Sequence, residues 1–81
     1  MKRIPIYITA RDFTQSHGRM PRGRGSWAFE ITYLGRNGGE QVVGPVFTPS
    51  MTFSESKRWI KQYITENAPD EADSADADAL S

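Results

Sequence analysis

Apolar and polar residues alternate along three segments of the chain, which is the pattern of strands with one buried face. The segments are residues 4–10, 26–34 and 40–47. The second is the clearest, because its aromatic and branched side chains fall on one side: Trp27, Phe29, Ile31 and Tyr33. An Asn-Gly pair at 37–38 precedes the third segment and predicts a hairpin turn. Gly44 and Pro45 interrupt the third segment and predict a bulge or an early sheet edge.

From residue 52 the spacing changes to that of a helix. Thr52 and Glu55 match the capping box, in which the two residues satisfy each other's backbone amides. Apolar residues then recur at helical spacing as far as residue 67, and Pro69 ends the helix. Trp59 and Ile60 are expected to pack on the aromatic face of the second strand, because so short a chain has few other large apolar groups. Tyr7 is the aromatic residue we expect to be exposed.

Two segments show neither the alternation of a strand nor the spacing of a helix. Residues 11–25 hold Pro21 and three glycines, and predict a long loop. Residues 68–81 contain no aromatic or β-branched side chain, so we expect them to be a disordered tail. The predicted fold is therefore α+β. A three-stranded antiparallel sheet is packed by one C-terminal helix, in the order β-β-β-α over residues 1–67, and a disordered acidic tail follows over residues 68–81.

The net charge of zero hides an asymmetry along the chain. Residues 1–67 hold all ten Lys and Arg and five of the ten acids, for a net charge of +5, and residues 68–81 hold the other five acids. A basic body favours a negatively charged partner. The acidic tail either competes with that partner for the basic surface or keeps the protein in solution, and the sequence leaves both roles open.

Arginines gather in the predicted loop, and further cations lie on the predicted helix. The residues we expect to contact a nucleic acid or another anionic partner are Arg11, Arg19, Arg22, Arg24, Lys57, Arg58 and Lys61. Lys2 and Arg3 add to the same basic cluster. Arginine favours recognition of phosphate or carboxylate, because its guanidinium group binds either with two parallel hydrogen bonds. The alternative is a solvated loop whose charges only maintain solubility.

Several classes of site are disfavoured. The chain has no Cys and one His, His17, so disulfides and cysteine-rich metal sites are excluded and a zinc site is not expected. We expect no cofactor and no enzymatic activity, since 81 residues leave little core around which to build a catalytic cleft. No apolar run approaches the length of a membrane span, and the lack of Cys fits a reducing cytoplasm.

The order of these segments resembles the N-terminal half of the ribonuclease H-like fold, three strands plus the first helix, over residues 4–64. The matching stretches are Ile-Tyr-Ile-Thr-Ala10, Arg-Gly-Arg-Gly-Ser-Trp-Ala-Phe-Glu-Ile-Thr-Tyr and Thr-Phe-Ser-Glu55. The resemblance implies that Glu55 occupies the position of a catalytic helix carboxylate. Ala10 stands where the first catalytic Asp is needed, and Asp12 comes two residues late. The resemblance therefore implies a catalytically degenerate, metal-free domain, because two-metal chemistry needs several converging carboxylates.

Residues 25–64 also resemble DNA-binding domains built from a three-stranded sheet and one helix. These include the arm-binding domain of phage tyrosine integrases and the plant ethylene-response-factor domain. The matching residues are Gly25-Ser-Trp-Ala-Phe-Glu-Ile-Thr-Tyr, Gly38-Gly, Gly44-Pro-Val-Phe-Thr48 and Glu55-Ser-Lys-Arg-Trp-Ile. Such domains read DNA with exposed side chains of the sheet. Here that face would carry Ala28, Glu30 and Thr32, and no Arg.

Two functions follow from these observations. The first is a small non-catalytic module that contacts nucleic-acid phosphates through its Arg/Gly-rich loop and its helix cations. The second is a protein-interaction module, such as a phage- or mobile-element-encoded inhibitor of a host defence complex, whose acidic tail would imitate nucleic-acid phosphates. A degenerate ribonuclease H-like domain is a third and less favoured interpretation.

Overall fold

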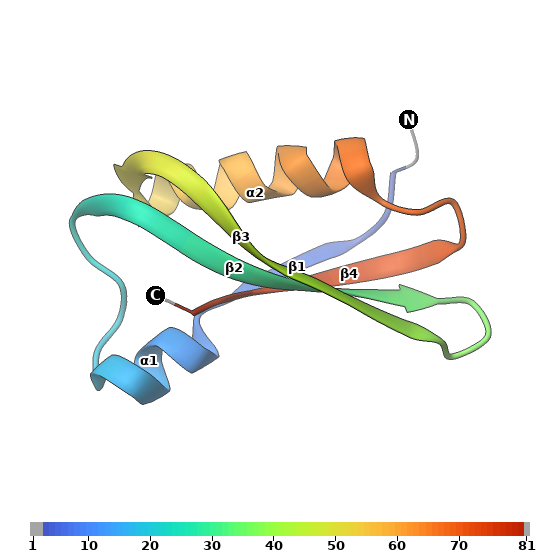
Figure 1. The fold of residues 1–81 in the computed structure, drawn as a ribbon, viewed down its shortest axis with the longest axis horizontal. Coiled ribbons are helices and arrows are strands. Elements are labelled where there is room, and N and C mark those ends of the chain that lie inside the picture. The colour runs from blue at the N-terminus through green and yellow to red at the C-terminus, as the bar shows by residue number, and fades with distance from the viewer. Residues whose placement is uncertain (1–2, 81) are drawn as a thin grey trace.

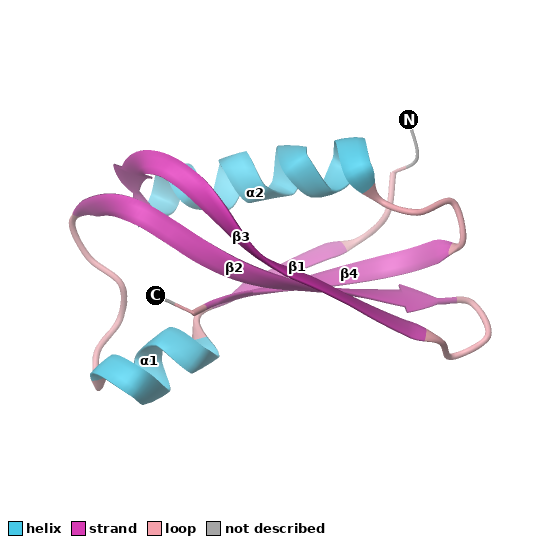
Figure 2. Cartoon of the chain, viewed as in Figure 1, coloured by secondary structure: helices cyan, strands magenta, loops and turns pink. Residues whose placement is uncertain are grey.

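The computed structural model describes residues 3–80, so the expectations for Lys2 and for the last residue of the tail lie outside the described residues. The elements are β1 (Ile6–Thr9), α1 (Arg11–His17), β2 (Arg24–Gly35), β3 (Glu40–Thr52), α2 (Phe53–Asn67) and β4 (Ala72–Ala79). The strands form one mixed sheet in the order β1-β4-β2-β3. Figures 1 and 2 show α2 lying along the sheet and α1 at one end of it. The α+β class is confirmed, with one strand and one helix more than we predicted.

The long β2–β3 hairpin supplies the core face of the sheet. Phe29 and Ile31 are fully buried, as the alternating pattern predicts, and Trp27 and Tyr33 are nearly so. The Asn-Gly turn is confirmed, with the amide of Gly35 donating to the carbonyl of Gly39 at 2.8 Å. Because β3 extends to residue 52, the hairpin leads directly into α2.

The predicted bulge in β3 is present at Gly44. The register between β2 and β3 shifts between Phe29 and Ile31, so Gly44 lies against the backbone of β2. A Cβ atom at this position would lie 2.9 Å from the carbonyl oxygen of Phe29, and the φ angle is +136°. Both features require glycine, since any side chain would collide with the neighbouring strand and strain the backbone.

The helix α2 follows the predicted spacing and begins at the predicted capping box. Ile60 and Ile64, one turn apart, are fully buried in the same cluster as Phe29 and Ile31. Trp59 corrects our prediction, because its side chain is only partly buried at the margin of that cluster. Helical geometry explains the difference: Ile60 points at the sheet, and Trp59, 100° earlier around the helix, lies toward the β3 side.

The expected disordered tail is replaced by a strand at the centre of the sheet. β4 pairs with β1 in parallel and with β2 in antiparallel orientation, and thereby lies between these two strands. Ala75, Ala77 and Ala79 are buried in the core cluster, and the intervening Asp76 and Asp78 lie on the other face. The residues are small and acidic, but they alternate with the period of a half-buried strand.

The predicted loop over residues 11–25 contains the helix α1. The N-cap residue Ala10, which precedes the helix, offers no side-chain cap. Asp78 of β4 takes that role, because its Oδ1 atom accepts hydrogen bonds from the amides of Arg11 at 2.9 Å and Asp12 at 3.4 Å. Phe13 anchors the helix against Trp27, with ring centroids 5.7 Å apart, and Gly18 ends it in the left-handed conformation.

No helix within residues 3–80 has both the length and the apolar character needed to cross a membrane.

Candidate anion-binding site

All seven cations singled out from the sequence are exposed, but they lie on three parts of the fold. Lys57, Arg58 and Lys61 are exposed residues of α2. Arg24 is the first residue of β2. The remaining three lie on α1 and in the connection after it: Arg11, Arg19 and Arg22.

A hollow of about 580 Å³ lies between α2 and the chain segment leading into β1. Its lining is Arg3, Ile4, Ile6, Arg58, Lys61, Gln62 and Thr65, and we call it the β1-side hollow. Three of these residues are cations and none is acidic. Arg3 thus joins the helix cations rather than the arginines of the α1–β2 connection. Sequence spacing gives no sign of this, because the parallel pairing of β1 with β4 determines where residue 3 lies.

A second hollow, of about 520 Å³, lies on the β3 side of α2. Its lining is Arg24, Ser50, Met51, Glu55, Arg58 and Trp59, and we call it the β3-side hollow. Arg58 lines both hollows and therefore lies on the crest of α2 between them. Sequence analysis identified the cations but did not assign Ser50, Met51 or Trp59 to a site.

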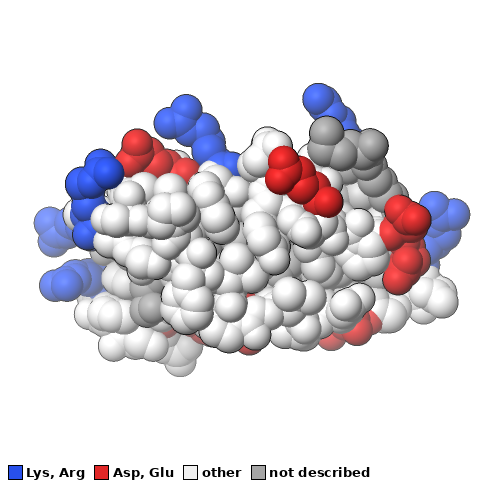
Figure 3. All heavy atoms as spheres, turned by 45° about the horizontal axis from the view of Figure 1, so that its top comes forward, with Lys and Arg blue, Asp and Glu red and all other residues white. Residues whose placement is uncertain are grey.

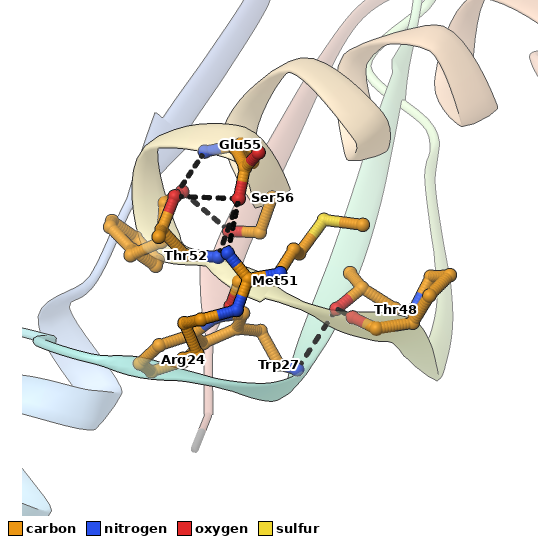
Figure 4. Close-up of polar contacts among 9 residues, drawn as sticks. Arg24, Trp27, Thr48, Met51, Thr52, Glu55 and Ser56 are labelled. Atoms are coloured by element: carbon orange, nitrogen blue, oxygen red, sulfur yellow. Dashed lines mark hydrogen bonds and ion pairs between the residues drawn. The ribbon is translucent and has the colours of Figure 1, made fainter.

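The wall of the β3-side hollow is held by a network at the start of α2 (Figure 4). The amide of Thr52 donates to Glu55 Oε1 at 2.9 Å, and the amide of Glu55 donates to Thr52 Oγ1 at 3.2 Å. Arg24 Nη1 lies 3.5 Å from the same Glu55 oxygen. Trp27 Nε1 donates to the carbonyl of Met51 at 2.8 Å, which ties the end of β3 to β2. The network thus holds two lining residues of the hollow, Arg24 and Met51, through their contacts with Glu55 and Trp27.

The hydrogen bonds from Thr52 hold the pKa of Glu55 below its ordinary value of 4.5, with smaller contributions from Arg24 and Arg58. A lowered pKa in the folded state means that ionised Glu55 stabilises the fold. This contribution is complete above about pH 4.5 and is lost as pH falls through the lowered pKa. We expect Glu55→Gln to be less stable than the wild type at pH 7.

The difference between the two proteins should shrink as pH falls below about 4.5, because protonated Glu55 and Gln are both neutral. Urea unfolding at several pH values between 3 and 7 measures it. A difference that stays constant over this range would show that the carboxylate charge has no part in the cap.

Ion pairing leaves most of the cations available for an external anion. Within residues 3–80, the ion pairs closer than 4.0 Å are Arg24–Glu55 and Arg36–Asp73. Lys57 instead lies over the ring of Phe53, with Nζ 5.6 Å from the ring centroid. In the view of Figure 3, Lys and Arg side chains project at the rim of a broad surface that carries few charges.

The sheet face opposite α2 carries acidic side chains instead of basic ones. Register places Tyr7, Asp76, Thr32 and Val42 in one row across the four strands of this face. Glu30 lies directly opposite Asp78 in the adjacent row. No Lys or Arg occupies these rows, so this face is acidic whereas the α2 side is basic. Tyr7 is 58% exposed, as predicted.

The positions implied by the ribonuclease H resemblance do not form a group of carboxylates. Ala10 precedes α1, Asp12 lies in its first turn, and Glu55 is bound to Thr52 and Arg24. Across the described part of the chain, no group of three or more His, Asp or Glu residues is placed to hold a metal ion. His17 lies on α1, where its ring stacks on Phe13 at 4.0 Å.

The chain matches no family model, no curated protein and no solved structure. The two resemblances therefore remain hypotheses.

Proposed function

We propose that this protein is a small non-catalytic module that binds nucleic acid by its phosphates, with the cationic side of α2 as the primary contact. The observation that carries the proposal is the position of Arg58, which lines both hollows flanking α2. The β1-side hollow adds Arg3 and Lys61, and the β3-side hollow adds Arg24. A chain of phosphates crossing α2 would meet a cation in each hollow and one on the crest between them.

The chemistry of these residues suits phosphate. Arginine presents a planar fork of donors that matches two phosphate oxygens, and three of the four cations named above are arginines. The β1-side hollow has no carboxylate in its lining to compete with the ligand. Arg19 and Arg22 lie shortly before Arg24 in an exposed connection, and extend the basic surface in that direction. Contacts of this kind position the ligand but read no sequence.

Binding should weaken steeply with salt, because each neutralised phosphate releases condensed counterions. We expect Arg58→Gln to weaken binding to DNA and RNA. The slope of log affinity against log salt should become flatter by about 0.7 for a single strand and about 0.9 for duplex DNA, which is the effect of one lost phosphate contact. Fluorescence anisotropy with labelled oligonucleotides at several salt concentrations measures both quantities.

The matched control is Arg36→Gln, which removes one positive charge from the β2–β3 turn, where Arg36 is paired with Asp73 at 3.7 Å. Its affinity and salt slope should stay near those of the wild type. Equal effects of the two substitutions would mean that net charge, rather than the α2 side, attracts the ligand. The double substitution Arg19→Gln with Arg22→Gln tests in the same assay whether the α1–β2 connection takes part.

A protein-interaction module is the second candidate, and the acidic sheet face favours it. Three of the four large apolar side chains exposed within residues 3–80 belong to strands β1 and β3, namely Tyr7, Val42 and Phe47. Tyr7 and Val42 lie in the same row as Asp76. A partner for this face would carry basic and apolar residues together. In that case the protein binds no nucleic acid at any salt concentration, and Tyr7→Ser with Val42→Ser abolishes capture of the partner from a nuclease-treated lysate.

A further inference from the structure

The β3-side hollow contains an aromatic side chain that phosphate binding does not require. Trp59 lines this hollow together with Arg24 and Arg58, the two cations of its lining. The volume of about 520 Å³ is within the range of small-ligand sites and exceeds what a phosphate group alone would fill. The combination of one aromatic ring and two guanidinium groups fits a ligand that has both a flat ring and a phosphate.

Trp59 has one ring face available to such a ligand. Tyr63, one turn later on α2, stacks on Trp59 with ring centroids 5.7 Å apart and an angle of 15° between the planes. Glu55, one turn earlier, lines the hollow with Trp59. The hollow therefore adjoins the face of the indole that is turned away from Tyr63. The stacked partner also holds the indole in place, so that little side-chain entropy is lost when a second ring stacks on it.

The charges around Trp59 place the phosphate on one side of the ring. Glu55 would repel a phosphate, but its carboxylate already pairs with Arg24 and accepts hydrogen bonds from Thr52. Arg58 has no ion pair within 4.0 Å in residues 3–80. It also lines the β1-side hollow together with Arg3 and Lys61. A ring stacked on Trp59 thus has its adjoining phosphates directed toward Arg58 and the β1-side hollow.

A base within a duplex cannot occupy this position, because both of its faces are covered by neighbouring base pairs. A single strand exposes its base faces, and aromatic side chains bind them with little dependence on sequence. Building on the proposed function, we infer that the ligand of the α2 side is single-stranded nucleic acid, with one base stacked on Trp59 in the β3-side hollow and the following phosphates running over Arg58 toward Arg3 and Lys61.

The test compares a labelled single-stranded oligonucleotide with the duplex of the same sequence, using the full chain at low salt. We expect the wild type to prefer the single strand. Trp59→Leu should reduce single-strand affinity by roughly five- to a hundredfold, the range for loss of one stacked base, and duplex affinity by less. Trp59→Phe should retain most of the binding, because the smaller ring still stacks. The matched control, Tyr7→Leu, removes an exposed aromatic ring from the opposite sheet face and should leave both affinities unchanged.

Intrinsic fluorescence gives a second readout that needs no variant. Trp27 is only 5% exposed, so quenching on addition of the single strand reports on Trp59. Quenching by the single strand and not by the duplex supports the inference, even if Trp59→Leu fails to fold. Equal affinity for the two forms, no quenching, or equal losses for both forms in Trp59→Leu would overturn it and leave the proposed function standing. Failure of the wild type to bind either form would overturn both proposals.

Discussion

A chain that stops after Pro69 is expected not to fold. It would lack β4, whose backbone hydrogen-bonds to β1 on one side and β2 on the other. β1 would then have no partner strand within the described sheet, and β2 would lose its pairing from residue 29 to residue 35. Four fully or almost fully buried alanines would also be missing from the core, which exposes Phe29 and Ile31. A typical domain is stable by only about 5–15 kcal/mol, so we expect the loss of a central strand to unfold the chain.

Circular dichroism during heating measures the outcome: the truncated chain should show no cooperative transition, whereas the full chain should. Asp76→Asn is the control for charge, because it removes one acid from β4 and keeps the strand. We expect that variant to melt near the wild type. A truncated chain that melts cooperatively at the same temperature as the wild type would refute the central position of β4 and restore the acidic segment to the role of a tail.

Ile60→Ala should destabilise the protein by about 2–5 kcal/mol, the usual cost of truncating a fully buried branched side chain. Ile60 has no exposed surface and belongs to the same cluster as Ile31 and Ala77. The cavity would open under the middle of α2, where the rigid backbones of helix and sheet limit how far the surroundings can collapse. Chemical denaturation gives the free energy of unfolding directly.

Trp59→Ala is the comparison for this variant. Although Trp59 is the larger residue, its side chain is only partly buried and stacks on Tyr63 at the margin of the core. We therefore expect a smaller loss of stability than for Ile60→Ala. A larger loss of stability in Trp59→Ala than in Ile60→Ala would mean that α2 packs against the sheet mainly through its β3 side. The line through Ile60 and Ile64 would then contribute less.

Local patterns in the sequence predicted the parts of the fold that local interactions determine. The hairpin follows from the Asn-Gly turn and the alternation in β2, and the start of α2 follows from Thr52 and Glu55. The fourth strand was not predicted because a segment rich in Ala and Asp is typical of disorder, although its apolar and polar residues alternate as in a strand. Ala and Asp have low strand propensity, but burial between two strands overrides propensity.

Long-range contacts determine the features that no local pattern reveals. The helix α1 depends on a cap from Asp78, 67 residues from Arg11 in the chain. The strand order depends on β4 entering between β1 and β2. The same applies to the candidate site: the spacing of Arg58 and Lys61 on α2 is evident from the sequence, but the contribution of Arg3 depends on where the sheet places the start of the chain.

The position of β4 also bears on how the protein is made. A ribosome releases β2, β3 and α2 before residues 72–79, so the hairpin and the helix that packs on it can form first. During that interval β1, although synthesised earliest, has no strand to pair with, and the edge of β2 that β4 will cover is open. The last strand must then insert between two existing segments rather than add to an outer edge. Until it does, the nascent chain exposes an unpaired strand edge, the feature by which partly folded chains associate with each other or engage chaperones.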